Sequence, residues 1–378
     1  MSNFFIQTLT AFWDQTGLSH LTAGHVIMWM IGLGLIYLAI HKKYEPLLLL
    51  PIGFGVFIVN MPLSPLMGVH GETRDLLNIF FHYGIEWDII PPVIFLGVGA
   101  LTDFGPLLSN PKTIFLGAAA QVGVYFAFFG AVAAGFSTRE AAAIGIIGGA
   151  DGPTSIFVTS TLAPHLLGPV AVSAYSYMAL VPIIQPPIMR LLTTAEERRL
   201  PMRQYRPVGR LEKILFPLAA SLIILLMVPK SGPLVAMFMI GNLFRESRVV
   251  ERLTLCAQNE LLNAATIFLG LSIGATMSAE NFLRPEAIKI FLLGLLAFCF
   301  STGGGILFAK LMNLFLKEKI NPLIGSAGVS AVPMAARVSE VVGIQANPRN
   351  HLLMHAMGPN VAGVIGTLVA AGSFLALL

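Results

Sequence analysis

Long stretches without any charged residue constrain this chain more than any other feature of its sequence. Three of them are about 20 residues long or longer: Ile114–Phe136, Leu166–Met189 and Leu352–Leu378. A helix needs about 20 apolar residues to cross the hydrocarbon core of a bilayer. Only 11% of the 378 residues are charged, whereas a soluble protein carries about 25%. We therefore expect an all-α polytopic membrane protein.

The basic residues lie in short segments between the apolar stretches. The segment from Arg190 to Lys213 contains seven basic and three acidic residues, a net charge of +4. Positively charged loops are retained on the cytoplasmic side of the membrane, so we expect this loop to be cytoplasmic. The net charge of the whole chain, also +4, does not point to nucleic acid as a partner.

The N-terminal region and the cysteines bound the remaining possibilities. Met1–His20 lacks a basic start followed by a short apolar core and a cleavage site, so we expect no removed signal peptide. The amphipathic segment Met1–Gly24 is expected to lie at the membrane interface. Cys256 and Cys299 stand alone in apolar surroundings, which gives no disulfide or metal pattern.

One carboxylate stands in an otherwise uncharged region. Asp151 is the only Asp, Glu, Lys or Arg between Glu140 and Arg190. A carboxylate at the centre of a bilayer costs about 2.5–3.5 kcal/mol on insertion scales and marks a functional site by default. It could bind a cation, carry a proton, or serve only packing. We favour a functional role, because no neighbouring charge in the sequence compensates it.

The residues around Asp151 predict a broken helix. Gly148-Gly149 precedes it and Gly152-Pro153 follows it, and both pairs interrupt a helix. We expect two half-length helices, at 141–149 and 153–163. Irregular backbone at membrane depth is tolerated only inside protein or beside a water-filled cavity. With the hydroxyls of Thr154 and Ser155, the freed carbonyls would form an oxygen-lined cation site.

The second half of the chain repeats this pattern. Three pairs of segments correspond: Val93–Gly97 with Thr266–Gly270, Asn110-Pro111 with Arg284-Pro285, and Ile146–Gly152 with Pro322–Ser330. Many secondary transporters use inverted repeats whose interrupted helices form a midplane site. We expect two related repeats, inverted in topology, each with a broken helix or half-helix hairpin near the bilayer midplane.

We expect four segments in chain order. Residues 1–75 hold the N-terminal interfacial segment and spans, and residues 76–192 hold the first repeat with the Asp151 break. Residues 193–259 hold the basic loop and linking membrane segments. Residues 260–378 hold the second repeat.

Polar residues accompany the second break. Asn321, Ser326 and Ser330, with carbonyls freed around Gly325, are the counterpart of the Asp151 stretch. Asn360 follows Gly358-Pro359 in the last span. Small residues also let helices pack closely in membranes, and this alternative applies to each of these positions. The correspondence with the Asp151 stretch favours a functional site at the second break. For Asn360 the functional and the packing interpretation both stay open.

Arg337 and two tyrosines are further candidates. Arg337 could snorkel to the membrane edge or bind an anionic group with its planar fork, and Glu340 could pair with it. Tyr175 and Tyr177 are interpreted from the sequence alone as residues of an interfacial aromatic belt.

Several long motifs, taken together, resemble one known family. They are Phe95–Pro106, Gly148–Thr154, Ile320–Gly325, Ala335–Ser339 and Gly358–Gly363. These segments are similar to the β subunit of the sodium-pumping biotin-dependent decarboxylases, which act on oxaloacetate, methylmalonyl-CoA or glutaconyl-CoA. The resemblance covers the chain from about Leu76 to its end.

The resemblance implies an enzyme subunit that decarboxylates carboxybiotin, exports Na⁺ and consumes a proton. Asp151 would be the sodium-binding aspartate, and Asn321, Gly325, Ser330 and Asn360 would form the other ion site. Tyr177 would take part in coupling, and Arg337 would lie near the carboxybiotin path.

The resemblance also implies partners and a location. Biotin would be carried by a separate biotin-carrier subunit, beside a carboxyltransferase subunit and a small membrane-anchoring subunit. The complex would reside in a bacterial or archaeal cytoplasmic membrane, in contact with the lipid bilayer, and association with further copies of this chain is open.

The repeat architecture by itself also allows a different class of protein. A stand-alone secondary transporter, either a Na⁺-coupled carboxylate symporter or a Na⁺/H⁺ antiporter, would use the same paired breaks. Export of a cation against 100 mV requires about 2.3 kcal/mol, and no segment resembles a nucleotide site. Decarboxylation on a partner subunit would supply that energy.

Overall fold

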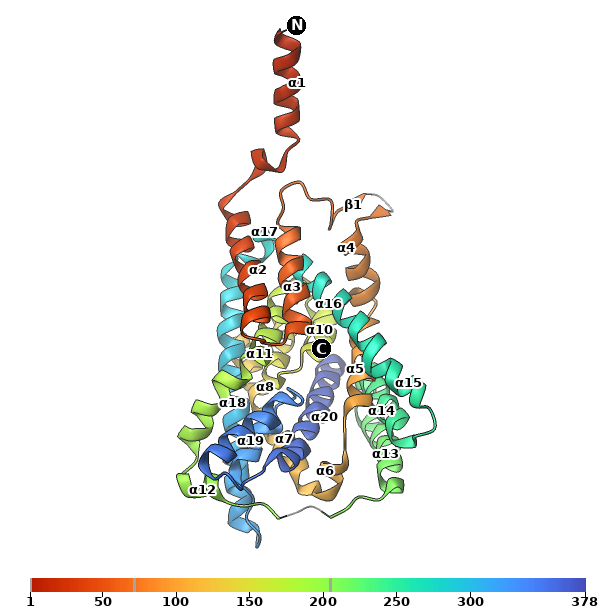
Figure 1. Cartoon of the computed structure of the whole chain (residues 1–378), viewed down its shortest axis with the longest axis vertical. Coiled ribbons are helices and arrows are strands. Elements are labelled where there is room, and N and C mark those ends of the chain that lie inside the picture. Colours follow the sequence, from red (N-terminus) through yellow and green to blue (C-terminus); the bar gives the residue numbers. More distant parts are fainter. Residues whose placement is uncertain (1, 71–72, 204–205) are drawn as a thin grey trace. The chain divides into compact units, whose positions relative to one another are not determined.

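Helices form nearly all of the regular structure in the computed structural model, which describes residues 2–70, 73–203 and 206–378 (Figure 1). Within these residues the strands are β1 (Val69–His70) and β2 (Thr73–Arg74), which pair antiparallel with Val69 opposite Arg74. The predicted all-α class is therefore confirmed.

The chain divides into two units. Unit 1 comprises residues 1–89 and 266–287, and unit 2 comprises residues 90–265 and 288–378. Two helices contribute to both units: α16 (Leu262–Thr276) and α18 (Pro285–Phe315). The two units are defined by contacts between residues and each combines segments that are distant in the sequence. They therefore do not test the four segments expected in chain order, which stay a prediction.

Unit 1 is built around a helical hairpin. Its remaining elements are α1 (Ser2–Asp14), η1 (Gly17–His20), α2 (Ala23–His41), α3 (Pro46–Val59), α4 (Leu76–Ile79), the π-helical η2 (Phe80–Glu86) and α17 (Ala279–Phe282). A Cβ on Gly32 would lie 2.9 Å from the carbonyl oxygen of Gly53, so α2 and α3 pack backbone to backbone. Asn60 ties this hairpin to the later segment, because its amide donates to Met277 O at 2.8 Å and accepts from Ala279 N at 2.8 Å.

Unit 2 holds the Asp151 stretch and the second break. Its elements, beside parts of α16 and α18, are α5 (Ile90–Leu101), α6 (Gly105–Ser109), η3 (Pro111–Thr113), α7 (Ile114–Ala120), α8 (Val122–Ala133), α9 (Thr138–Gly145), η4 (Ile146–Gly149), α10 (Gly152–Leu162), η5 (Pro164–Leu166), α11 (Leu167–Leu192), α12 (Ala195–Arg199), α13 (Arg210–Met227), η6 (Pro229–Ser231), α14 (Gly232–Ser247), α15 (Glu251–Cys256), the π-helical η7 (Ala257–Leu261), η8 (Pro322–Gly328), α19 (Met334–Ala346) and α20 (Leu353–Leu377).

Among the described residues, four helices are long and apolar enough to cross a membrane: Ala23–His41, Pro111–Ala133, Pro285–Phe315 and Leu353–Leu377. The number rises to as many as six if each of two bent helix pairs is counted as one span. One of these pairs is Pro164–Met178 with Leu180–Leu192, bent by 62°. This chain is a multi-pass membrane protein.

The first break has the predicted form. Ser137 caps α9, since its hydroxyl accepts from Glu140 N while the Glu140 carboxylate accepts from Ser137 N at 2.8 Å. Glu140 also pairs with His165 at 2.8 Å, which closes the base of the α9–α10 hairpin. The two short helices α9 and α10 lie close to the expected 141–149 and 153–163.

The second break differs from the two half-helices expected there. The segment after Asn321 is a single 3₁₀ helix, η8, and the chain stays irregular until α19 begins at Met334. Close backbone packing explains this form. A Cβ on Gly325 would lie 2.2 Å from Gly305 O of α18, and one on Gly328 would lie 2.5 Å from Leu116 O of α7.

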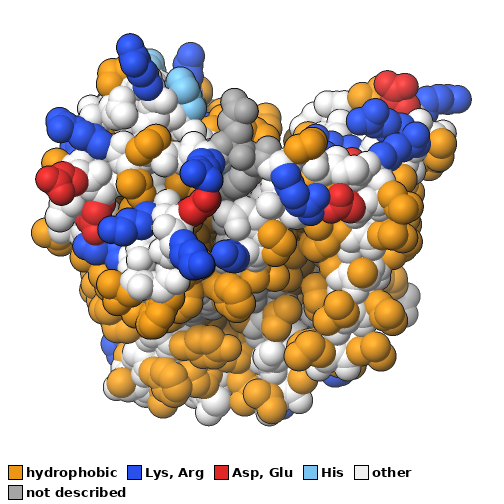
Figure 2. Space-filling model, turned by 90° about the horizontal axis from the view of Figure 1, so that it is seen from below, with side chains coloured by type: hydrophobic (Ala, Val, Ile, Leu, Met, Phe, Trp, Pro, Cys, Tyr) orange, Lys and Arg blue, Asp and Glu red, His pale blue; other side chains and the backbone are white. Residues whose placement is uncertain are grey.

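Figure 2 shows basic side chains gathered on one part of the face that it presents. Arg206 pairs with Glu212 at 2.7 Å, and Arg203 pairs with Glu318. Arg203, Arg206 and Glu212 belong to the basic loop between Arg190 and Lys213. The expected cytoplasmic location of this loop stays a prediction.

Candidate cation site

Asp151 begins a helix at the centre of the first break. Ala150 takes the left-handed conformation (φ 54°), which ends η4 and turns the chain. Asp151 then caps α10, because its Oδ1 accepts a hydrogen bond from Thr154 N at 3.1 Å. The positive end of the α10 dipole favours a negative charge at this position. The side chain is buried, with 5% of its surface exposed.

The second break supplies the other partner of this carboxylate. The Ser330 hydroxyl donates to Asp151 Oδ2 at 2.8 Å, and Ser330 N donates to Gly149 O at 2.9 Å. The two residues are 179 positions apart in the sequence. The structure therefore joins the two interrupted segments at Asp151, and no basic side chain among the described residues forms an ion pair with it.

Two buried oxygens lie in this region. Asn360 Oδ1 has no hydrogen-bond partner among the described residues, and Thr154 Oγ1 lies beside the Asp151 carboxylate. The Asn360 amide nitrogen donates to Ala327 O at 3.0 Å and Val329 O at 2.7 Å, which fixes it beside Ser330. A buried polar atom without a partner is costly, so Asn360 Oδ1 fits a bound cation. Carboxylate, hydroxyl and amide oxygens are ligands of the kind that hard cations prefer.

Two further polar residues, neither of them predicted from the sequence, lie under the first break. A Cβ on Gly149 would lie 2.7 Å from the Thr367 side chain, and Thr367 Oγ1 donates to Gln121 Oε1 at 3.3 Å. Gln121 also donates to Gly363 O at 3.3 Å. One signal could have revealed Gln121, since it is the only amide in the apolar segment Ile114–Phe136.

Asn321 and Gly325 are engaged elsewhere. The Asn321 amide donates to Arg198 O at 3.0 Å and Leu200 O at 2.9 Å, and its Oδ1 accepts from Leu323 N. Asn321 thus fastens the start of η8 to the basic loop. Gly325 packs against Gly305, as the close approach of their backbones shows. The assignment of either residue as an ion ligand stays a prediction.

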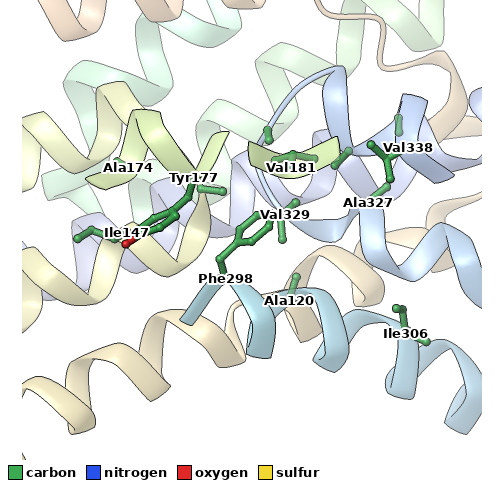
Figure 3. Packing of buried hydrophobic residues seen from close by; sticks show 14 of the residues in the cluster. Ala120, Ile147, Ala174, Tyr177, Val181, Phe298, Ile306, Ala327, Val329 and Val338 are labelled. Atoms are coloured by element: carbon green, nitrogen blue, oxygen red, sulfur yellow. The ribbon is translucent and has the colours of Figure 1, made fainter. Parts of the chain in front are cut away.

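The tyrosines of α11 are buried inside unit 2, so their interpretation as an interfacial belt is wrong. Tyr177 lies beside Ile147 (Figure 3), and both contact the position where a Cβ on Gly294 would stand. Its hydroxyl donates to Phe291 O. The Tyr175 ring covers Gly152, where a Cβ would lie 2.2 Å from Cε1. Both rings pack on the two sides of the break because α11 runs beside η4 and α10.

Arg337 and Glu340 do not pair with each other. Arg337 is exposed on α19, and within the described residues its side chain forms no ion pair or hydrogen bond. Glu340 accepts from Leu352 N and from Leu353 N, the latter at 2.7 Å, and pairs with His351 at 3.0 Å. The suggested Arg337–Glu340 pair is therefore wrong, because the carboxylate caps the start of α20 instead.

The fold and this geometry define a class: a multi-pass helical membrane protein with a buried carboxylate where two interrupted segments meet. The family model of the Na⁺-transporting oxaloacetate decarboxylase beta subunit matches residues 24–378. This chain belongs to that family.

Individual relatives agree with this assignment. Methylmalonyl-CoA decarboxylase subunit beta of Veillonella parvula is 59% identical over 365 residues, covering 97% of this chain and 96% of that protein. Glutaconyl-CoA decarboxylase subunit beta of Acidaminococcus fermentans is 55% identical, covering 99% and 98%. Oxaloacetate decarboxylase beta chain of Klebsiella pneumoniae is 50% identical, covering 98% and 99%. The relatives are beta subunits or beta chains of decarboxylases, and the resemblance to this family is confirmed.

Proposed function

We propose that this chain is the membrane subunit of a decarboxylase complex that couples carboxybiotin decarboxylation to Na⁺ export. The observation that carries the proposal is the contact between Asp151 and Ser330 at the junction of the two breaks. A buried carboxylate without a basic partner requires a cation or a proton for neutralisation. The Asp151 carboxylate can therefore bind Na⁺ and H⁺ in turn. A pump that exports Na⁺ and consumes a proton needs such a group.

The cation would be held by a small set of oxygens. We assign it to the Asp151 carboxylate, the hydroxyls of Ser330 and Thr154, and Asn360 Oδ1. Ser330 donates its hydrogen to Asp151, so the lone pairs of its oxygen stay available. Asn360 contributes a buried oxygen without a hydrogen-bond partner among the described residues, and Thr154 contributes a buried hydroxyl beside the Asp151 carboxylate. Na⁺ would enter from the face that carries the basic loop.

The chemical step would take place on a group carried by a partner subunit. The bond between the carboxyl carbon and the ureido nitrogen of carboxybiotin breaks, CO₂ leaves, and the nitrogen takes up a proton. We assign Arg337 to hold the anionic carboxyl group, because its side chain is exposed and has no described partner. Tyr177 joins α11 to α18 beside η4, where movement of the break would be transmitted to α18. Proton delivery would release the ion from Asp151.

The partners follow from this reaction. A biotin-carrier subunit would deliver carboxybiotin, a carboxyltransferase subunit would load it, and a small membrane subunit would anchor the complex. The location is a bacterial or archaeal cytoplasmic membrane. Self-association of this chain is compatible with the assignment.

Replacement of Asp151 tests the proposal. We expect Asp151→Asn in the reconstituted complex to lose Na⁺ stimulation of decarboxylation, because a neutral amide cannot exchange a cation for a proton. Asp103→Asn is the matched control, since Asp103 is an acid of unit 2 whose carboxylate pairs with Lys213 at 3.0 Å. Unchanged Na⁺ stimulation in Asp151→Asn would overturn the proposal.

A second experiment separates a complex from a stand-alone transporter. Solubilised protein is passed over immobilised avidin, which retains biotinylated carrier subunits. Co-purification of this chain supports the decarboxylase complex. Failure to co-purify, together with Na⁺-coupled transport by the chain alone in vesicles, supports a symporter or antiporter instead.

A further inference from the structure

Another buried amide, Gln185, is not part of the Asp151 site. Gln185 of α11 is fully buried, and its Nε2 donates to Ser326 O at 2.9 Å and to Thr302 Oγ1 at 3.4 Å. Its Oε1 has no hydrogen-bond partner among the described residues. Gln185 is the only amide in the apolar segment Leu166–Met189.

The surroundings of this amide are rich in neutral oxygens. Thr302, Ser326 and Ser339 are all fully buried, and the Ser326 and Ser339 hydroxyls lie 3.0 Å apart. Prolines at 182, 186 and 187 interrupt α11 on both sides of Gln185. Each proline lacks an N–H, so a carbonyl four residues earlier loses its helical partner. Carbonyls released in this way coordinate Na⁺ in transporters with interrupted helices.

Gln185 is also placed between the basic loop and Asp151. It contacts η8 at Ser326, and η8 runs from Asn321, which is fixed to the loop, towards Ser330, which contacts Asp151. Seven residues of 3₁₀ helix extend about 14 Å. The neighbour of Thr302 on α18, Ser301, donates to Gly148 O at 2.6 Å, directly before the Asp151 turn.

We propose that Gln185 Oε1 and Thr302 Oγ1, with the α11 carbonyls released by the prolines, form a second, uncharged Na⁺ site that precedes Asp151 on the ion path. The site rests on the proposed function in that it uses the same ion. Without a carboxylate it binds Na⁺ but cannot exchange it for a proton, so it holds the ion in transit and leaves the exchange to Asp151.

A purely structural role makes a different prediction. If Gln185 serves only to donate to Ser326 O, any side chain without an N–H destabilises the protein and leaves Na⁺ binding unchanged. Asn242 provides a matched control, because it is a fully buried amide that donates to Gly99 O and Thr102 O and leaves its Oδ1 without a described partner. Within the described residues its amide donates to backbone carbonyls alone, at the junction of α14 with the end of α5.

The test is equilibrium binding of radioactive Na⁺ to the purified full-length protein, with choline chloride holding the ionic strength constant. We expect Gln185→Leu to bind one ion fewer per chain, or to bind Na⁺ at least about tenfold more weakly. Tenfold is the lower limit because removing a residue that only supports a metal ligand already weakens metal binding by about 10–100-fold. We expect Asn242→Leu to bind as the wild type does. Equal loss in both variants, or no loss in Gln185→Leu, would overturn the proposal.

A second variant keeps the test valid if Gln185→Leu fails to fold. Gln185→Glu keeps the oxygen and removes the N–H donor. We expect it to bind as many Na⁺ ions as the wild type at high pH. As the pH falls it should show a second loss of bound Na⁺ besides the one at Asp151, because a buried carboxyl group must lose its proton before it binds a cation. The same pH dependence as the wild type, or one ion fewer at every pH, would contradict the second site.

The outcomes also distinguish this inference from the proposed function. If Asp151→Asn loses a bound ion and Gln185→Leu does not, the second site is refuted and the proposed function stands. If Gln185→Leu loses a bound ion and Asp151→Asn does not, the second site stands and the assignment of Asp151 as the exchanging group is refuted. A wild-type protein that binds no Na⁺ overturns both.

Discussion

The Ser330 hydroxyl donates a hydrogen bond of 2.8 Å to Oδ2 of Asp151, and the Ser330 amide donates to the carbonyl of Gly149, two residues before that aspartate. One residue of the second break therefore contacts both the backbone and the carboxylate of the first. Any movement of η8 is transmitted to the only acid between Glu140 and Arg190.

Removal of the Ser330 hydroxyl is predicted to weaken Na⁺ binding. A hydrogen bond to a charged group contributes about 1.5–3 kcal/mol, so Ser330→Ala should raise the Na⁺ concentration for half-maximal decarboxylation by about tenfold or more. Ser330→Thr keeps the hydroxyl and should retain most of the affinity. Ser173→Ala is the control, because the buried Ser173 hydroxyl donates to Pro169 O of its own helix. An unchanged Na⁺ dependence in Ser330→Ala would count against the site.

Gly325 is predicted to act through packing. In Gly325→Ala the new Cβ would lie 2.2 Å from Gly305 O, and in Gly305→Ala it would lie 2.0 Å from Gly325 O. Each change should lower the free energy of unfolding by about 1–3 kcal/mol or more, with the Na⁺ affinity of the folded fraction unchanged. Thermal unfolding in detergent measures the first quantity and Na⁺ titration the second. Gly34→Ala serves as control, because its Cβ would meet nothing within 4 Å. A stable Gly325→Ala protein with altered Na⁺ affinity would instead favour an ion-binding role for Gly325.

Gly152 is predicted to be required because of the Tyr175 ring. A Cβ at position 152 would lie 2.2 Å from Cε1 and 2.4 Å from Cζ of that ring, so Gly152→Ala should displace Tyr175 or the start of α10. We expect Gly152→Ala to be less destabilising in a Tyr175→Leu background than in the wild type. A double-mutant cycle of unfolding midpoints isolates this coupling. Strictly additive effects would show that the ring does not limit this position.

The Asp103–Lys213 pair is predicted to be lost in acid. Burial of the Asp103 carboxyl would raise its pKa, but hydrogen bonds from Gly105 N–H and Lys213, with the charges of Lys213 and Arg245, hold the pKa below its ordinary value of 3.8. A depressed pKa in the folded state stabilises the protein above the unfolded pKa, and this stabilisation disappears as the pH falls through the folded pKa.

Unfolding midpoints between about pH 7 and pH 3 check this prediction. The wild type should lose stability below about pH 4, and Asp103→Asn should lose less over the same interval. Glu318→Gln is the control, because the Arg203–Glu318 pair is mostly exposed and such pairs contribute little. Parallel curves for wild type and Asp103→Asn would contradict the assignment.

The sequence was sufficient for the class of protein and for the first break. Charge-free segments such as Ile114–Phe136 predict membrane helices because burying charge in hydrocarbon is costly. Gly148-Gly149 and Gly152-Pro153 predict a break because their effect on the backbone is local. The Asp151 region could therefore be identified as a candidate site from the order of its residues alone.

Only the tertiary structure decided which side chains meet. Ser330 reaches Asp151 across 179 positions, whereas Asn321, four residues before Gly325, is bound by carbonyls of the basic loop. Glu340 caps α20 and leaves Arg337 without that partner. Gln121 and Gln185 become significant only because packing buries them beside the breaks. Such contacts depend on how distant backbones approach each other, and no periodicity or composition within a single segment records that approach.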